Sequence, residues 1–159
     1  MSGGRPKFFD SRSFAPVMKI FTKVHVALFR ASRGYFTGKF RFGSAFPGGV
    51  PVGLLTTVGR KTGKARTMAL LYMPDGDRCV FVASRGGTGR HPQWYLNIRS
   101  QPKVRVQMRG GGPREMVAHE AEGDEREHLW KRLVDFYPEY GDYQTWTDRQ
   151  IPVVVCAPA

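Results

Sequence analysis

The chain has 159 residues, which is enough for one domain with a sizeable buried core. Its formal net charge of +12 implies an anionic partner, such as nucleic acid, an anionic membrane surface or a polyanionic small ligand. No apolar run approaches the ~18 residues of a membrane span, and no signal-peptide core follows the first residues, so we expect a cytoplasmic protein.

The basic first third of the chain divides into a tail and a helix. Residues 1–50 hold nine Lys and Arg against one acid, Asp10, and residues 1–13 have the composition of a disordered tail. Apolar residues then recur at steps of three and four, which predicts an amphipathic helix over residues 14–33. This apolar stripe consists of Phe14, Val17, Met18, Phe21, Val24 and Leu28.

The remainder, residues 51–159, is predicted to be mostly strands. They are expected over residues 52–58, 67–73, 78–84, 103–109, 114–122 and 151–156. An Asp-Gly pair predicts a hairpin turn over residues 74–77. Two helices are expected, one from Pro92 to Ser100 and one from a capping box of Asp124 and Glu127 to Phe136. Hairpin-length connections predict a mainly β fold, a small antiparallel barrel with helices packed outside.

A glycine and cation loop joins the first two strands at residues 59–66. Glycine lets a backbone approach a ligand closely and cations supply charge-assisted hydrogen bonds, so the loop is a candidate anion site. It fails the Walker A template, because three residues separate Gly59 and Gly63 and Ala65 follows Lys64. A basic, solvated hairpin tip is the equal alternative.

Two further segments combine polar and aromatic groups. A strand ends at Ser84 and opens into a glycine loop, and the next helix carries Trp94 and Asn97 on one face. Ser and Asn offer hydrogen bonds to a polar ring, and Trp offers a stacking surface. Each of these residues alone would also suit simple packing.

The segment over residues 136–149 is predicted to be rich in loops. Its tyrosines, at every third position, can line an apolar pocket while their hydroxyls remain available as donors. The alternative is that the rings simply pack in the core and their hydroxyls face solvent. The tyrosines are Tyr137, Tyr140 and Tyr143. The adjacent Asp148 and Arg149 are interpreted as a structural polar pair.

The usual hydrolytic and metal-binding patterns are missing from the sequence. The four histidines have no ligand spacing, and we expect no metal site. Cys79 and Cys156 lie in apolar runs, which favours two buried thiols and leaves a disulfide open. With no nucleophile elbow or paired carboxylates, an enzyme of this kind would need a cofactor to carry its reaction.

Together these segments resemble a known family, the deazaflavin (F420)-dependent nitroreductases and quinone reductases of actinobacteria. The matching stretches lie in order over residues 52–157 and are 54–63, 82–87, 91–97 and 137–154. The resemblance implies a split β-barrel like that of flavin-binding reductases, formed by residues 51–159. It also implies hydride transfer from reduced coenzyme F420 to quinones, menaquinone-like ones included, or to nitro-aromatic and nitroimidazole compounds.

The resemblance also implies roles for individual residues. The cofactor's phosphate and acidic tail would meet Arg60, Lys61, Thr62 and Arg66. Its ring would meet Ala69, Leu70, Leu71, Val82, Ser84, Arg85 and Gly86. Trp94 and Asn97 would flank it. The substrate would meet Tyr137, Tyr140, Tyr143 and Trp94, and the proton would come from Tyr143, Ser84 or water, with Tyr140 a further catalytic candidate.

The sequence leaves several alternatives open. The barrel could bind flavin mononucleotide instead, or single-stranded nucleic acid through its positive charge. The cations gather in loops rather than between aromatics on strands, so we expect no nucleic acid. The helix over residues 14–33 could lie on an anionic membrane at the inner face of the cell, or it could pack on the barrel as a lid.

Overall fold

The structure is a computed structural model, and it describes residues 14–35, 39–40 and 49–159. The tail expected over residues 1–13 lies outside this part, as do the side chains of Phe14, Val17, Met18 and Phe21. The helices are α1 (Phe14–Ser32), α2 (Gln93–Ser100), α3 (Gly123–Phe136) and α4 (Glu139–Thr145), with a single 3-10 turn at Arg85–Gly87. The strands are β1 (Lys39–Phe40), β2 (Val50–Val58), β3 (Ala65–Leu71), β4 (Met73–Asp75), β5 (Arg78–Val82), β6 (Lys103–Gln107), β7 (Pro113–Glu120) and β8 (Val153–Pro158).

The strands form one antiparallel sheet that curls into a split barrel, as predicted. Its order is β1-β2-β6-β7-β8-β5-β4, and β3 pairs along β2. Only Tyr72 separates β3 from β4, and its amide donates to the Pro51 carbonyl (3.1 Å). The chain therefore passes directly from a strand paired with β2 to one paired with β5, which joins the two ends of the sheet.

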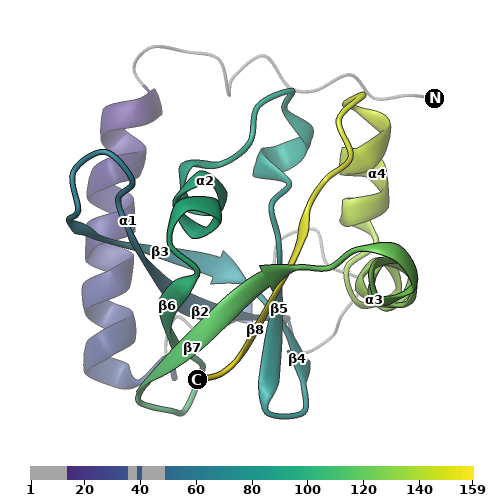
Figure 1. Cartoon of the computed structure of the whole chain (residues 1–159). Coiled ribbons are helices and arrows are strands. Elements are labelled where there is room, and N and C mark those ends of the chain that lie inside the picture. Colours follow the sequence, from purple (N-terminus) through teal and green to yellow (C-terminus); the bar gives the residue numbers. More distant parts are fainter. Residues whose placement is uncertain (1–13, 36–38, 41–48) are drawn as a thin grey trace.

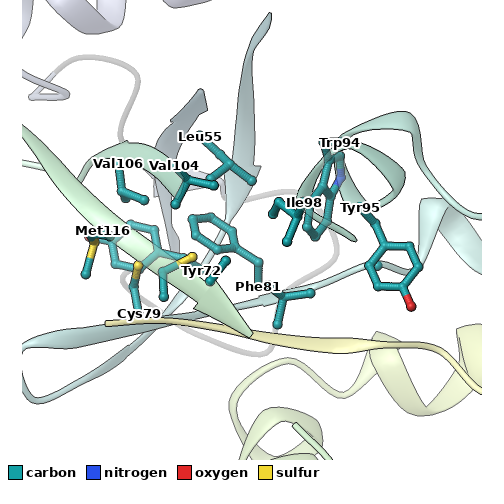
Figure 2. Packing of buried hydrophobic residues seen from close by; sticks show 14 residues of the cluster. Leu55, Tyr72, Cys79, Phe81, Trp94, Tyr95, Ile98, Val104, Val106 and Met116 are labelled. Carbon is teal, nitrogen blue, oxygen red and sulfur yellow. The ribbon is translucent and has the colours of Figure 1, made fainter. Parts of the chain in front are cut away.

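The interior of the barrel explains why its strands are so apolar. Phe81 lies at the centre of the cluster, with Leu55 and Val104 on one side and α2 on the other (Figure 2). It meets Trp94 of α2 edge-on, with ring centroids 6.3 Å apart. A second cluster packs α3 and α4 on the sheet, so β5 and β8 are buried on both faces and lose the alternation of a half-exposed strand.

The cysteines are free and buried inside this core. Cys79 of β5 and Cys156 of β8 are direct cross-strand partners. A hydrogen bond with Cys79, together with burial, raises the pKa of the Cys156 thiol, so both side chains behave as small apolar groups.

Helix α1 packs on the outside of β3, away from α3 and α4 (Figure 1). Among the side chains of α1 that the structure describes, Val26 and Phe29 are buried and meet Leu54 of β2. The predicted stripe does not face the barrel where it is described, because Val24 and Leu28 are 53% and 52% exposed. Apolar residues occupy two faces of this helix, and contact with β3 selects the face that periodicity does not favour.

Two other local predictions are wrong. Helix α3 begins at Gly123 after Glu122, with no side-chain cap, so Asp124 lies inside the first turn and forms no capping box. Residues 139–145, expected as loop, form α4. This short helix is held by tertiary packing, since Tyr140 is 5% exposed within the second cluster.

Candidate functional site

The β2–β3 hairpin carries the glycine and cation loop. Gly63 has a φ of 65°, a conformation that glycine adopts readily. The hairpin docks on α2, because the Arg60 amide donates to Asn97 Oδ1 (3.2 Å) and the Arg60 guanidinium donates to Gln93 Oε1 (2.8 Å). The loop is therefore held against the barrel rather than being a free, solvated tip.

Asn97 owes its burial to this docking. Its side chain is 6% exposed, and its Nδ2 donates to the Thr57 hydroxyl (3.1 Å) while Oδ1 accepts from Arg60. Both ends of the amide are thus engaged within the protein. Asn97 acts on this side of the site by fixing the hairpin.

A cavity of about 830 Å³ lies between the hairpin, α1 and α2, and we call it the cationic cavity. Its lining contains four cations and no carboxylate. The cations are Lys23, Arg60, Lys61 and Arg66. Flexible cations without acidic partners suit phosphate and carboxylate groups.

A second cavity of about 520 Å³, the aromatic cavity, lies between β3, the Ser84 loop and α4. Its walls are mainly apolar or aromatic, with the hydroxyls of Ser84 and three tyrosines and the side chains of His25 and Arg85 among them. The two cavities share Thr22, Met68 and Trp94, so they form one continuous cleft with a charged end and an aromatic end.

Every site residue predicted from the sequence lines this cleft. The cationic cavity takes Arg60, Lys61, Thr62, Arg66, Trp94 and Asn97. The aromatic cavity takes Ala69, Leu70, Leu71, Val82, Ser84, Arg85, Gly86, Trp94, Tyr137, Tyr140 and Tyr143. Four segments far apart in the chain are thus brought to one place, which is the geometry a bound cofactor requires.

The Ser84 loop has an unusual backbone. Arg85, Gly86 and Gly87 have successive φ values of 47°, 61° and 72°, and such a conformation is unfavourable for Arg85. A side chain at Gly87 would place its Cβ 2.8 Å from the Tyr143 carbonyl oxygen. The loop therefore packs tightly on α4, and only glycine fits there.

Arg149, which the sequence suggested was merely half of a polar pair, holds this loop in place. Its Nε donates to the Thr88 carbonyl (2.8 Å), and its Nη2 donates to those of Ala83 (3.1 Å) and Ser84 (2.7 Å). A third nitrogen, Nη1, lies 3.3 Å from His91 Nδ1. One guanidinium thus links both ends of the strained loop to the start of α2.

The contact with Arg149 makes His91 sensitive to pH. Burial and the charge of Arg149 lower the pKa of His91 from its ordinary 6.5, so its neutral ring accepts at Nδ1. Because the unfolded chain binds this proton more readily, stability should fall as pH drops through about 6.5. We expect His91→Gln, which keeps a neutral acceptor, to lose this part of the pH dependence in chemical denaturation at pH 5 to 8. An identical pH dependence in both proteins would contradict this assignment.

The three tyrosines pack edge-on at the aromatic end, with Tyr137 at the end of α3 and the other two in α4. Ring centroids of Tyr137 and Tyr140 lie 4.9 Å apart, and those of Tyr140 and Tyr143 lie 6.3 Å apart. Burial raises the pKa of Tyr137 and of Tyr140, so both phenols stay protonated at ordinary pH and act as donors, not bases. Tyr143 is half-buried and hydrogen-bonds Tyr137.

Helix α1 contributes lining residues that the sequence did not single out. Thr22 lines both cavities, Lys23 the cationic one and His25 the aromatic one. The sequence allowed the helix over residues 14–33 to pack on the barrel as a lid, but it did not indicate which of its residues would line the site. No spacing could have assigned Arg149, whose partners lie up to 66 positions away.

Comparison with known proteins gives consistent results. A family model described as F420H(2)-dependent quinone reductase matches residues 22–158. A putative F420H(2)-dependent quinone reductase of Mycobacterium tuberculosis is 40% identical over 74% of this chain and 98% of its own. An F420H(2)-dependent quinone reductase of the same species is 36% identical over 84% of this chain and 87% of its own. The solved structure of an F420-H2 dependent reductase, FDR-A, matches with a TM-score of 0.60 at 45% identity, covering 67% of this chain and 93% of the other.

Proposed function

Because the chain belongs to the F420H(2)-dependent quinone reductase family, and is thus an oxidoreductase that uses reduced coenzyme F420, we propose that the cleft holds this cofactor across its two ends. The cationic cavity would take the phosphate and acidic tail, and the aromatic cavity would take the ring and the quinone. The observation that carries this assignment is the continuity of the two cavities at Thr22, Met68 and Trp94. The family match favours coenzyme F420 over flavin mononucleotide as the cofactor.

The residues present fit such a cofactor. The charged end has cations without carboxylates, and the aromatic end offers flat apolar walls with a few hydroxyl donors. We propose that Arg60, Lys61, Thr62 and Arg66 hold the anionic groups. On the ring side, the residues of β3 together with the Ser84 loop provide the walls, and Asn97 fixes the hairpin that closes the charged end.

When bound, reduced F420 supplies the hydride of the reaction. The protein would orient the quinone against the ring, exclude water and donate a proton to the oxygen that becomes anionic. Tyr143 and Ser84 are the proposed donors, because both line the aromatic cavity. Tyr137 and Tyr140 remain protonated and would hydrogen-bond the substrate's oxygens, and nearby Arg85 would favour the developing negative charge.

We propose menaquinone-like quinones as the substrates, and activated nitro-aromatic compounds as further acceptors. Both are flat, electron-poor groups that an aromatic cavity of about 520 Å³ can stack. Steady-state assays with both classes, following loss of reduced F420, test the proposal. Turnover of neither would contradict it.

Replacing Lys61 and Arg66 together by alanine should weaken cofactor binding about tenfold at low salt, because two charge-assisted contacts are lost. The difference from the wild-type protein should shrink as salt rises, since both side chains are exposed. Fluorescence titration with F420 measures both effects. The matched control is Lys103→Ala with Lys131→Ala, which removes two exposed cations outside the cleft. Wild-type F420 affinity in the Lys61→Ala, Arg66→Ala variant would show that the hairpin does not contribute to the cofactor site.

We also propose that α1 contacts anionic membranes through its outer face. No helix of the described residues is long and apolar enough to cross a membrane, but Val24 and Leu28 are both more than half exposed. Val24→Ser with Leu28→Ser should reduce co-sedimentation with anionic vesicles and leave F420 affinity unchanged. Deleting residues 1–33 provides the comparison. Unchanged sedimentation of both variants would sink this proposal.

A further inference from the structure

A third cavity, of about 280 Å³, continues the cleft along α1. It lies between α1 and β3 and is lined by Thr22, Lys23, Val26, Ala27, Arg30 and Thr67. Three of these residues, Thr22, Lys23 and Thr67, also line the cationic cavity. The two spaces therefore form one groove that runs from the hairpin tip along the inner side of α1.

Cations line this groove from α1 and, at its other end, from the hairpin residues of the cationic cavity. Lys23 and Arg30 are seven positions apart, so they share one face of α1 and are separated by about 10 Å along its axis. Arg30 Nη2 donates to the Thr67 hydroxyl (3.3 Å), which in turn lies 2.8 Å from that of Thr56. This contact aims the Arg30 side chain across the groove toward β3.

The groove has no acid to balance this charge. None of the residues that line the two cavities is Asp or Glu. Elsewhere in the described residues arginines pair with carboxylates, as Arg105 does with Glu115 and Arg132 with Asp75. Arg30, Lys23 and the hairpin cations have no such partner within the described part of the chain. Uncompensated cations gathered along one groove, from α1 and from the β2–β3 hairpin, therefore favour an anionic ligand.

The length of the groove selects the kind of anion. A single phosphate is only a few ångströms across and can meet one end, whereas an extended peptide-like chain covers ~3.5 Å per residue. An acidic chain of three or more residues would thus reach from the hairpin to Arg30. A membrane surface suits this place less well, because the groove lies between α1 and β3 while the exposed apolar residues lie on the outer face.

We infer that the groove between α1 and β3 is a subsite for the distal glutamates of the F420 tail, contacted by Lys23 and Arg30. The inference rests on the proposed placement of the cofactor in the cleft. It has a consequence for the substrate end, because Thr22 and His25 of the same helix line the aromatic cavity. A longer tail would hold α1 on the barrel and so complete that wall, and by linkage a docked helix would raise the affinity for a long tail.

The test is fluorescence titration with F420 species that carry no glutamate, two glutamates, or five or more. Wild-type affinity should rise with tail length. In Lys23→Gln with Arg30→Gln we expect affinity for the longest tail to fall about five- to tenfold at low salt, with no change for the tail-free species. Lys103→Gln with Lys131→Gln is the matched control and should bind all species as the wild type does.

A second readout follows the helix itself. Amide hydrogen exchange in residues 22–32 should slow more with a long-tailed cofactor than with a tail-free one, and the Lys23 and Arg30 variant should lose this difference. Equal weakening for every tail length, or unchanged discrimination in the variant, would overturn the subsite. If Lys23→Gln with Arg30→Gln loses vesicle binding but keeps the wild-type dependence of F420 affinity on tail length, the subsite is overturned in favour of a membrane role. If the wild-type protein binds no F420 species, the proposed cofactor site fails as well.

Discussion

Arg149→Ala is expected to lower the free energy of unfolding by about 2–4 kcal/mol, because the carbonyls of Ala83, Ser84 and Thr88 lose a charged donor. Arg85 would then have less to hold it in its unfavourable backbone conformation. We expect F420 affinity to fall about tenfold or more, since the loop would no longer be preorganised to meet the ring. Chemical denaturation and fluorescence titration measure the two effects.

The conservative change Arg149→Lys separates the loss of positive charge from the loss of the guanidinium's several N–H donors. Arg149→Lys keeps a cation but cannot donate to carbonyls on both sides of the loop, so we expect an intermediate loss of affinity and stability. Arg90→Ala removes an exposed arginine from the neighbouring loop and should behave as the wild type. Normal F420 affinity in a folded Arg149→Ala protein would show that the loop needs no such support.

Tyr143→Phe should lower turnover on the order of 10²-fold, because it removes a proposed proton donor. The phenyl ring can keep its contacts with Tyr140 and Trp146, so F420 affinity should change little. The hydrogen bond with Tyr137 is lost, so the free energy of unfolding should fall by about 1 kcal/mol. The kcat for quinone reduction is the relevant measurement. Ser84→Ala tests the other proposed donor, and the larger fall in kcat identifies which hydroxyl delivers the proton.

Tyr95→Phe is the matched control for this experiment. The Tyr95 hydroxyl donates to Glu120 Oε2 (2.6 Å), and Tyr95 lines neither cavity. Burial, with the neighbouring Glu120, raises the pKa of Tyr95 to about 12, so this hydroxyl stays protonated. Tyr95→Phe therefore removes a structural hydrogen-bond donor only. An unaltered rate in Tyr143→Phe would reject a chemical role for that hydroxyl.

The strands and α2 were predictable because local patterns and burial agree. Residues 52–58 and 92–100 were expected as a strand and a helix, and the structure has a strand over Val50–Val58 and a helix over Gln93–Ser100. The site residues could also be predicted, since glycines, cations and aromatics cluster in short segments of the sequence. Their roles were assigned by the resemblance to a family and not by periodicity.

What the sequence did not provide depends on contacts between distant segments. Helix α4 forms because Tyr140 packs into the second cluster and Gly87 packs under Tyr143. The buried face of α1 depends on β3, so Val26 and Phe29 face inward although Val24 and Leu28 fit the periodicity better. Arg149 gains its role only when the Ser84 loop is brought beside it, and no local pattern records that approach.

The most direct test of the cleft is one titration of the purified protein with three ligands, followed by fluorescence. They are reduced deazaflavin F420, flavin mononucleotide and a single-stranded oligonucleotide. The continuous cleft with a charged and an aromatic end predicts micromolar or tighter binding of F420 and little binding of the other two. Micromolar binding of flavin mononucleotide with none of F420 would contradict the assignment of the cleft.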